Sequence, residues 1–236
     1  MSRISIIIPA LNEAETLPLT FESILGELSE DIIVVDGGSQ DETVKVAEAL
    51  GARVIESSVQ NRAYQMNLGA EQALGSILLF LHADTRLPLG YAEKIITALS
   101  VPKTVAGAFA LGIDGEQTSF RLIEKTVNWR SRFLGLPYGD QAIFLPKRLF
   151  QEIGGFVNMP IMEDFNLIQR LKRRGNIHLI PDKVITSSRR WQKLGIYRTT
   201  LTNQFIVLGY YFGVSPEMLA GWYGRKSQKA QEKAIL

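Results

Sequence analysis

The chain has 236 residues, of which 46% are hydrophobic and 21% charged, and this composition excludes an intrinsically disordered protein. Its formal net charge of +2 conceals an uneven distribution along the chain. The absence of cysteine excludes disulfides and thiolate metal sites, and it favours a reducing compartment such as the cytoplasm.

Strand and helix signals alternate along the first half of the chain. Four short apolar runs predict strands, at Ile4–Ile8, Ile32–Val35, Val54–Ile55 and Ile77–Leu81. A helix is predicted between each pair of strands, the third over about Arg62–Ala73. This order is typical of a parallel sheet with helices on both faces.

Two of these helices carry a start signal. Asn12 and Glu15 have the spacing of a capping box, which predicts a helix that continues to about Leu28. Ser39 and Glu42 repeat the spacing before an Ala-rich helix. In both segments we expect the first polar residue to cap the helix.

The second half has a less regular pattern. Strands are predicted at Val105–Leu111 and Ala142–Leu145, with a long helix through Leu122–Phe133 between them. Another helix follows Glu163 and Asp164. The fold class is therefore α/β: a single Rossmann-like domain with a mostly parallel, mixed sheet and helices on both faces.

No repeat, linker or break in composition divides the chain. We predict one domain over residues 1–224, with a nucleotide-binding half over about 1–112 and an acceptor half over about 113–224. A polar tail over 225–236 would follow it.

Polar residues follow three of the predicted strands. They are Pro9 to Glu13 after the first, Asp36 to Asp41 after the second and His82 to Asp84 after the fourth. In an open α/β sheet, ligands bind beyond these carboxyl ends. Carboxylates there can bind ribose hydroxyls, base N–H groups or a hard divalent cation. Neither the dinucleotide fingerprint nor the P-loop motif is present.

Each of these residues also has a structural interpretation when it is taken singly. Asp36 could stabilise a turn, and Ser39 or Asp41 could cap a helix. Asp84 and Asp164 could be helix caps as well. Their occurrence in order along one edge of the sheet favours a functional site.

Six segments resemble, in order and spacing, the family-2 glycosyltransferases with a GT-A fold. They are IIIPALNEAETL, IIVVDGGSQDET, NRAYQMNLGA, LLFLHADT, YGDQAIFLPKRLFQEIGGF and MEDFNLIQRLKRRG. The resemblance runs from about residue 3 to residue 192 and is nearest to small bacterial members of unknown acceptor. It implies a metal-dependent, inverting hexosyltransferase that uses a nucleoside-diphosphate sugar, with UDP favoured.

The resemblance also implies residue roles in donor binding. Asp36 would pair with the base of the donor, and Arg190 would contact its pyrophosphate. The residues expected around the donor are Pro9, Asn12, Glu13, Asp36, Gly38, Arg62, Asn67, His82, Ala83, Arg190 and Trp191. Trp191 would also line the path of the acceptor.

The metal and the base are implied in the same way. Asp84 matches the last Asp of the family's D-x-D motif and would ligate Mg²⁺ or Mn²⁺. Asp164 resembles the general base that deprotonates the acceptor hydroxyl, with Glu163 as the alternative base. His82 departs from the first Asp of D-x-D, and it could hydrogen-bond ribose, bind the metal or pack. Gly37 stands where a second Asp is usual, so the ribose contacts and the choice of donor stay open.

Three alternative functions remain open at this point. A sugar-phosphate nucleotidyltransferase would carry a glycine-rich, basic loop after the first strand, where this chain has Pro9 to Glu13. A non-catalytic nucleotide-sugar-binding protein would commonly have lost Asp84 or Asp164. A nucleic-acid-binding function is the third, but the sequence contains no recognised nucleic-acid-binding motif.

The C-terminal third predicts a peripheral contact with the inner face of the cytoplasmic membrane. Residues 170–236 hold 13 Lys or Arg against three acidic residues. Residues 205–214 are apolar and aromatic, too few to span a bilayer but enough for an interfacial helix. The same run would equally suit the core or a homodimer interface.

Overall fold

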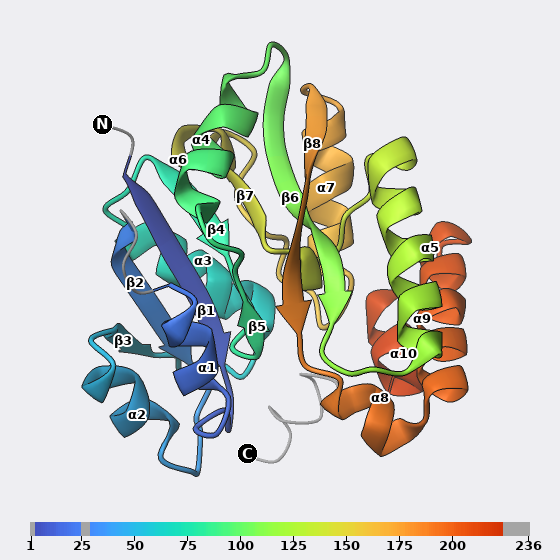
Figure 1. Cartoon of the computed structure of the whole chain (residues 1–236), viewed down its shortest axis with the longest axis horizontal. Helices are drawn as coiled ribbons and strands as arrows, with labels where there is room; N and C mark the ends of the chain where they lie inside the picture. The colour runs from blue at the N-terminus through green and yellow to red at the C-terminus, as the bar shows by residue number, and fades with distance from the viewer. Residues whose placement is uncertain (1–2, 25–28, 224–236) are drawn as a thin grey trace.

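An eight-stranded mixed sheet forms the centre of the molecule in the computed structural model, which describes residues 3–24 and 29–223 (Figure 1). The strands are β1 (Ile4–Ala10), β2 (Ser29–Asp36), β3 (Arg53–Glu56), β4 (Ile77–Phe80), β5 (Thr85–Arg86), β6 (Thr104–Ile113), β7 (Ile143–Pro146) and β8 (Asn176–Thr186). Their order in the sheet is β3-β2-β1-β4-β7-β6-β8-β5. The first four are parallel, and β7 runs antiparallel to both of its neighbours. The predicted mixed α/β sheet is confirmed.

Helices cover both faces of this sheet (Figure 1). They are α1 (Leu17–Glu22), α2 (Thr43–Ala49), α3 (Arg62–Gln72), α4 (Tyr91–Ser100), α5 (Thr118–Leu134), α6 (Lys147–Glu152), α7 (Glu163–Lys172), α8 (Arg189–Leu194), α9 (Ile196–Tyr211) and α10 (Pro216–Trp222), with a 3₁₀ turn η1 (Gly139–Gln141). One core joins the sheet to α1, α2 and α4, and another joins it to α3, α6, α7, α9 and α10.

Strand β1 explains why apolar cores lie on both faces of the sheet. Ile6 and Ile8 belong to the core under α1 and α4, and Ile7 belongs to the core under α3. Successive side chains of a strand point to opposite faces, so a continuous apolar run supplies both. Most residues of β1 are fully buried, as the β-branched run predicts.

The predicted capping box at Asn12 is wrong. Asn12 has φ 55°, in the left-handed region, and its Oδ1 accepts a hydrogen bond from the backbone N–H of Gln40. Helix α1 begins only at Leu17, where Pro18 in its first turn supplies a preset φ and lacks an N–H that would need a partner. It ends at Glu22, and Leu28, the predicted end, lies outside the described residues.

The second capping box is also wrong. The Ser39 hydroxyl bonds to the Asp36 carboxylate, and α2 begins three residues after the expected position, at Thr43. Asp41 accepts a hydrogen bond from the backbone N–H of Thr43 instead. These polar side chains therefore join loops to one another more than they cap helices.

Strand β8 was not predicted because Pro181 and Asp182 interrupt its apolar pattern. In the sheet, Ile180 pairs with Phe109 and Lys183 pairs with Ala110, so the two intervening residues form a bulge. The bulge lets one long strand accommodate a proline. The predicted polar tail at 225–236 lies outside the described residues.

Candidate active site

A cavity of about 700 Å³ opens beyond the carboxyl ends of β1 and β4. Its wall comes from the loops after these two strands, from η1, and from the first turns of α3, α7 and α8 with part of α9. The predicted site residues in this wall are Pro9, Glu13, Arg62, His82, Ala83, Asp84, Glu163, Asp164, Arg190 and Trp191. The fold therefore brings the two halves of the chain to one site. Asn12, Asp36, Gly38 and Asn67 lie outside its lining.

Asp36 stabilises the loop that follows β2. It is buried, and its carboxylate accepts hydrogen bonds from the backbone N–H groups of Gly38 and Ser39, at 2.8 and 2.9 Å. Gly38 has φ 91°, which favours glycine. Asp36 pairs in the sheet with Ala10, which lines the cavity, so the loop lies one strand from the cavity wall.

Two side chains of α3 hold the surroundings of the site in place. The Gln65 side-chain amide donates to the carbonyls of Ala10 and Val35, at 3.1 and 2.8 Å, and so joins the ends of β1 and β2. Asn67 bonds to both the N–H and the carbonyl of Phe156. Gln65 was missed in the sequence because a lone Gln in a helix carries no motif.

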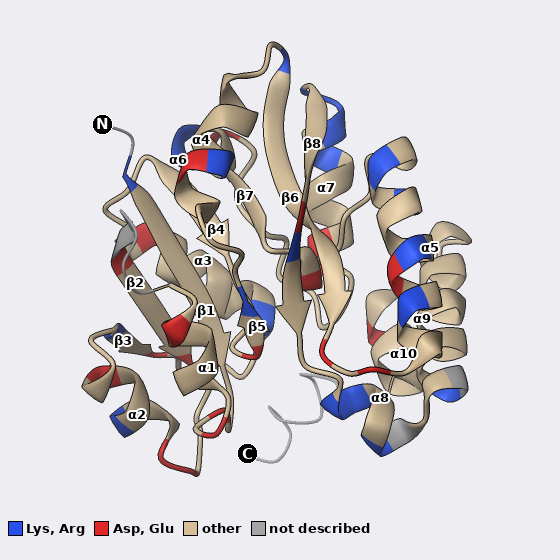
Figure 2. Ribbon diagram, viewed as in Figure 1, with Lys and Arg blue, Asp and Glu red and all other residues tan. Residues whose placement is uncertain are grey.

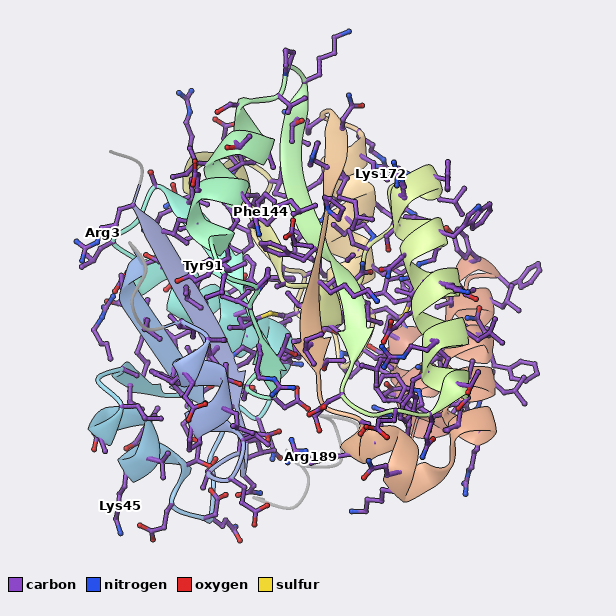
Figure 3. All side chains as sticks on the ribbon, viewed as in Figure 1. Arg3, Lys45, Tyr91, Phe144, Lys172 and Arg189 are labelled. Atoms are coloured by element: carbon purple, nitrogen blue, oxygen red, sulfur yellow. The ribbon has the colours of Figure 1, made fainter. Side chains whose placement is uncertain are left out.

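Two carboxylates and a guanidinium meet at the mouth of the cavity. Arg189 Nη2 lies 2.6 Å from Glu13 Oε2 and 3.4 Å from Asp84 Oδ2. Figure 3 shows Arg189 reaching from α8 toward the strand ends. Burial raises the pKa of Asp84, the Glu13 carboxylate raises it further, and the Arg189 guanidinium opposes both. Two carboxylates thus already converge on a cation.

This pair of carboxylates fits a hard divalent ion that brings other ligands with it. Within residues 3–24 and 29–223, no three His, Cys, Asp or Glu side chains gather as a metal-binding group. Mg²⁺ is typically held by one or two carboxylates, with phosphate and water oxygens completing its shell. Asp84 suits such an ion only when a phosphate is also present.

Gly139 links Asp164 to the opposite wall. Its backbone N–H donates to Asp164 Oδ2 at 2.6 Å. A Cβ at this position would lie 3.1 Å from Asp164 Oδ2, 3.1 Å from His82 Nε2 and 2.8 Å from Arg62 Nη2. The residue before Asp140 must therefore be small for these three side chains to meet.

The neighbouring Glu163 is almost fully buried. Its Oε1 lies 3.6 Å from Arg62 Nε, and Arg62 opens α3 directly after the N-cap Asn61. Met162, just before Glu163, has φ 70°. Non-glycine residues in this region carry strain that accumulates at functional sites. The two acids of the pair thus have different partners, a cation for Glu163 and a backbone N–H for Asp164.

Tyr138 and Asp140 complete the wall and were given no role by the sequence. Burial raises the pKa of Tyr138 to about 12, although the Arg130 guanidinium lies 3.5 Å from the centre of its ring. Burial also raises the pKa of Asp140, to about 6, with Arg130 acting against this rise and Asp164 adding to it. Their segment, YGDQAIFLPKRLFQEIGGF, resembles the family, but a single Asp in a loop carries no specific sequence signal for a role.

Several polar atoms in the wall have no partner among the described residues. They are Asp140 Oδ1, Trp191 Nε1 and Asn203 Oδ1, each out of contact with solvent. Buried polar atoms in proteins are nearly always hydrogen-bonded. The cavity is therefore suited to a ligand with many hydroxyl or amide groups.

A family model described as glycosyl transferase family 2 matches residues 5–156. A PGL/p-HBAD biosynthesis glycosyltransferase from Mycobacterium bovis is 43% identical over 91 residues, 35% of this chain and 36% of that protein. The matched region thus spans little more than a third of the length of that relative.

Two solved structures share the fold. A mannosyltransferase from Pyrobaculum calidifontis, in complex with GDP-Man and Mn²⁺, has a TM-score of 0.64 and 17% identity over 78% of this chain and 56% of that one. Glucosyl-3-phosphoglycerate synthase from Mycobacterium tuberculosis, in complex with Mn²⁺, UDP and glucosyl-3-phosphoglycerate, has a TM-score of 0.59 and 20% identity over 77% and 70%. The predicted GT-A fold is confirmed.

Proposed function

Because this chain belongs to glycosyl transferase family 2, we propose that it moves a sugar from a nucleoside-diphosphate sugar to a hydroxyl group of an acceptor. The supporting observation is that one cavity joins Asp84, suited to a metal–diphosphate, to Asp164, suited to a base. The unpaired polar atoms in its wall suit a sugar. The family match favours this reaction over a nucleotidyltransferase or a non-catalytic binding protein.

The donor binds with its diphosphate at the mouth of the cavity. Asp84 would hold a divalent ion, Mg²⁺ or Mn²⁺, which would supply positive charge beside the leaving diphosphate. Arg189 and Arg190 flank the same place from α8, where Figure 2 shows a concentration of basic residues. Both similar solved structures contain Mn²⁺ with a nucleotide or nucleotide sugar, and this supports the assignment.

Asp164 removes the proton from the acceptor hydroxyl as it attacks. Its Oδ2 accepts from Gly139 N–H, and this contact fixes the orientation of the carboxylate. Glu163 faces Arg62 instead, which makes it the weaker candidate. A single displacement with one base inverts the anomeric configuration. NMR of the product anomer tests this mechanism, and a retained configuration would overturn the role of Asp164.

Thermal shift with a panel of nucleotide sugars tests the proposed function. A ligand that binds the folded state stabilises it by RT ln(1 + [L]/Kd), about 2.7 kcal/mol at a hundredfold excess over Kd. We expect a UDP-sugar or a GDP-sugar to raise Tm in the presence of Mn²⁺, and less in EDTA. If no nucleotide sugar shifts Tm, the proposed function fails.

We propose further that the acceptor is held at an anionic membrane surface. The relatives are named for different products, so the family does not fix the acceptor. No helix within the described residues is long and apolar enough to cross a bilayer. Helix α9 instead has two sides: Ile206 packs in the core, whereas Phe205 and the C-cap residue Phe212 are 64% and 85% exposed.

The exposed side of α9 has the composition of an interfacial helix. Leu201, Phe205, Leu208 and Phe212 recur at the spacing of one helix face, and each is more than half exposed. The helix has no acidic residue, and Arg198 is exposed on it. Apolar side chains beside cations suit an anionic lipid surface.

Vesicle flotation tests this surface. With vesicles containing one-quarter phosphatidylglycerol, the unsubstituted protein should float and Phe205→Ser with Phe212→Ser should not. Leu89→Ser is the control, because Leu89 is 90% exposed in the loop before α4. If the unsubstituted protein stays at the bottom of the gradient, the membrane proposal is wrong, and a dimer on this face becomes the explanation.

A further inference from the structure

Asp140 is a half-buried acid to which the proposed reaction assigns no role. It lies in η1, between Gly139 and Gln141, and lines the cavity. The residue as a whole is half-buried, but its Oδ1 is out of contact with solvent and has no hydrogen-bond partner among the described residues. A buried carboxylate oxygen without a hydrogen-bond partner carries a desolvation penalty, and the nearby Arg130 guanidinium offsets it only in part.

Two buried acids in the described part of the chain, Asp31 and Glu124, are fully paired. Asp31 accepts hydrogen bonds from a guanidinium, that of Arg53, and from a hydroxyl and a backbone N–H. Glu124 accepts one from a backbone N–H and pairs with two cations, one of them Lys183. Acids that serve the structure are thus satisfied by it, whereas Asp140 is not.

The position of Asp140 shows which part of the donor it would meet. In a single displacement, the anomeric carbon lies between the leaving phosphate and the attacking oxygen. Gly139, the preceding residue, touches both sides of that gap: its Cβ position lies 3.1 Å from His82 Nε2 and 3.1 Å from Asp164 Oδ2. A sugar placed between them would lie beside Gly139, the residue next to Asp140, and Asp140 lines the same cavity.

We infer that Asp140 binds a hydroxyl group of the transferred sugar and so selects which sugars are accepted. The inference rests on the proposed function, since it needs a nucleotide sugar in the cavity. An ionised carboxylate can only accept, and sugar hydroxyls are the donors that would fill its vacant position. A site that hydrogen-bonds a substrate hydroxyl strongly rejects an analogue lacking it.

Calorimetry with UDP and UDP-glucose in the presence of Mn²⁺ separates the sugar contact from the nucleotide contact. If the thermal-shift panel shows that the protein prefers a GDP-sugar, GDP and GDP-mannose replace UDP and UDP-glucose. In Asp140→Asn, the Kd of the nucleoside diphosphate should stay within about twofold, and that of the nucleotide sugar should rise roughly tenfold or more. Unchanged UDP binding also shows that the variant is folded. Asp182→Asn, on β8 and paired with Lys94, is the matched control and should change neither value.

Monodeoxy analogues of the nucleotide sugar identify the contact. One of them should bind the unsubstituted protein roughly tenfold more weakly than the parent sugar, and Asp140→Asn should no longer discriminate between the two. An equal rise in Kd for UDP and UDP-glucose, or an unchanged ratio of the two, would overturn the assignment to the sugar. Undiminished discrimination by Asp140→Asn would overturn it as well. If no nucleotide binds the unsubstituted protein, the proposed function itself has failed.

Discussion

A few hydrogen bonds and ion pairs hold the carboxylates of Asp164 and Asp84 in the cavity wall. Two backbone N–H groups, from Gly139 and Phe165, orient the Asp164 carboxylate, and Asp84 shares one guanidinium with Glu13. Neither arrangement is needed to hold the sheet together, since the two cores lie on either side of it. The residues of the site can therefore be changed with effects on turnover that are separate from effects on folding.

Gly139→Ala should reduce turnover with little loss of stability. The added Cβ would displace Arg62, 2.8 Å away, and also Asp164 and His82, each 3.1 Å away. Small misplacements of reacting groups cost on the order of 10²-fold in rate. Release of nucleoside diphosphate measures turnover, and a thermal melt measures stability. Gly221→Ala is the control, because a Cβ there meets nothing within 4 Å. Equal turnover in both variants would contradict the position given to Asp164.

Asp140→Asn should stabilise the protein without ligand at neutral pH. The pKa of Asp140 is raised from 3.8 to about 6, so the folded state favours the protonated carboxyl group. The stability that the protonated group contributes is lost as pH rises through about 6. The Asn side chain does not ionise, so the variant does not lose this stability. The free energy of unfolding should rise by roughly 2–3 kcal/mol at pH 7.5, with the gain disappearing near pH 4. Urea melts at the two pH values measure it, and a less stable variant at pH 7.5 would refute the burial argument.

The helices and strands explain why part of the molecule could be predicted and part could not. Apolar runs such as Ile4–Ile8 identify strands because both faces of the sheet are covered. Local hydrogen-bonding patterns failed at Asn12 and Ser39, because their side chains bond to each other's loops across 27 or 28 residues. The sequence did not predict a role for Asp140 for a similar reason: the residues around it come from distant segments of the chain.

Ala142→Gly tests the strain in the segment that carries Asp140. Ala142 has φ 51°, and a left-handed conformation costs a non-glycine residue about 1–2 kcal/mol. The change should be neutral or slightly stabilising. Ala47→Gly, equally buried but inside α2, should cost about 1 kcal/mol. Urea unfolding compares the two, and equal losses would show that the segment is unstrained.

The whole molecule places opposite charge on the two sides of its cavity. Acidic residues lie on the loops around β1 and α2, and basic residues lie on α8 (Figure 2). Arg189 and Glu13 join these sides, 176 residues apart in sequence. A metal–diphosphate, which carries both signs of charge, suits this arrangement. The cavity thus depends on the complete fold and not on either half alone.

Titration calorimetry of the donor selected by the panel, with and without Mn²⁺, tests the central claim most directly. The unsubstituted protein should bind that nucleotide sugar in Mn²⁺ and roughly tenfold more weakly in EDTA, because in the proposed mechanism Asp84 and a divalent ion bind the diphosphate together. Asp84→Ala should bind weakly in both solutions, while Asp114→Asn, an exposed acid paired with Arg86, should behave as the unsubstituted protein does. Undiminished, Mn²⁺-independent binding by Asp84→Ala would contradict the account.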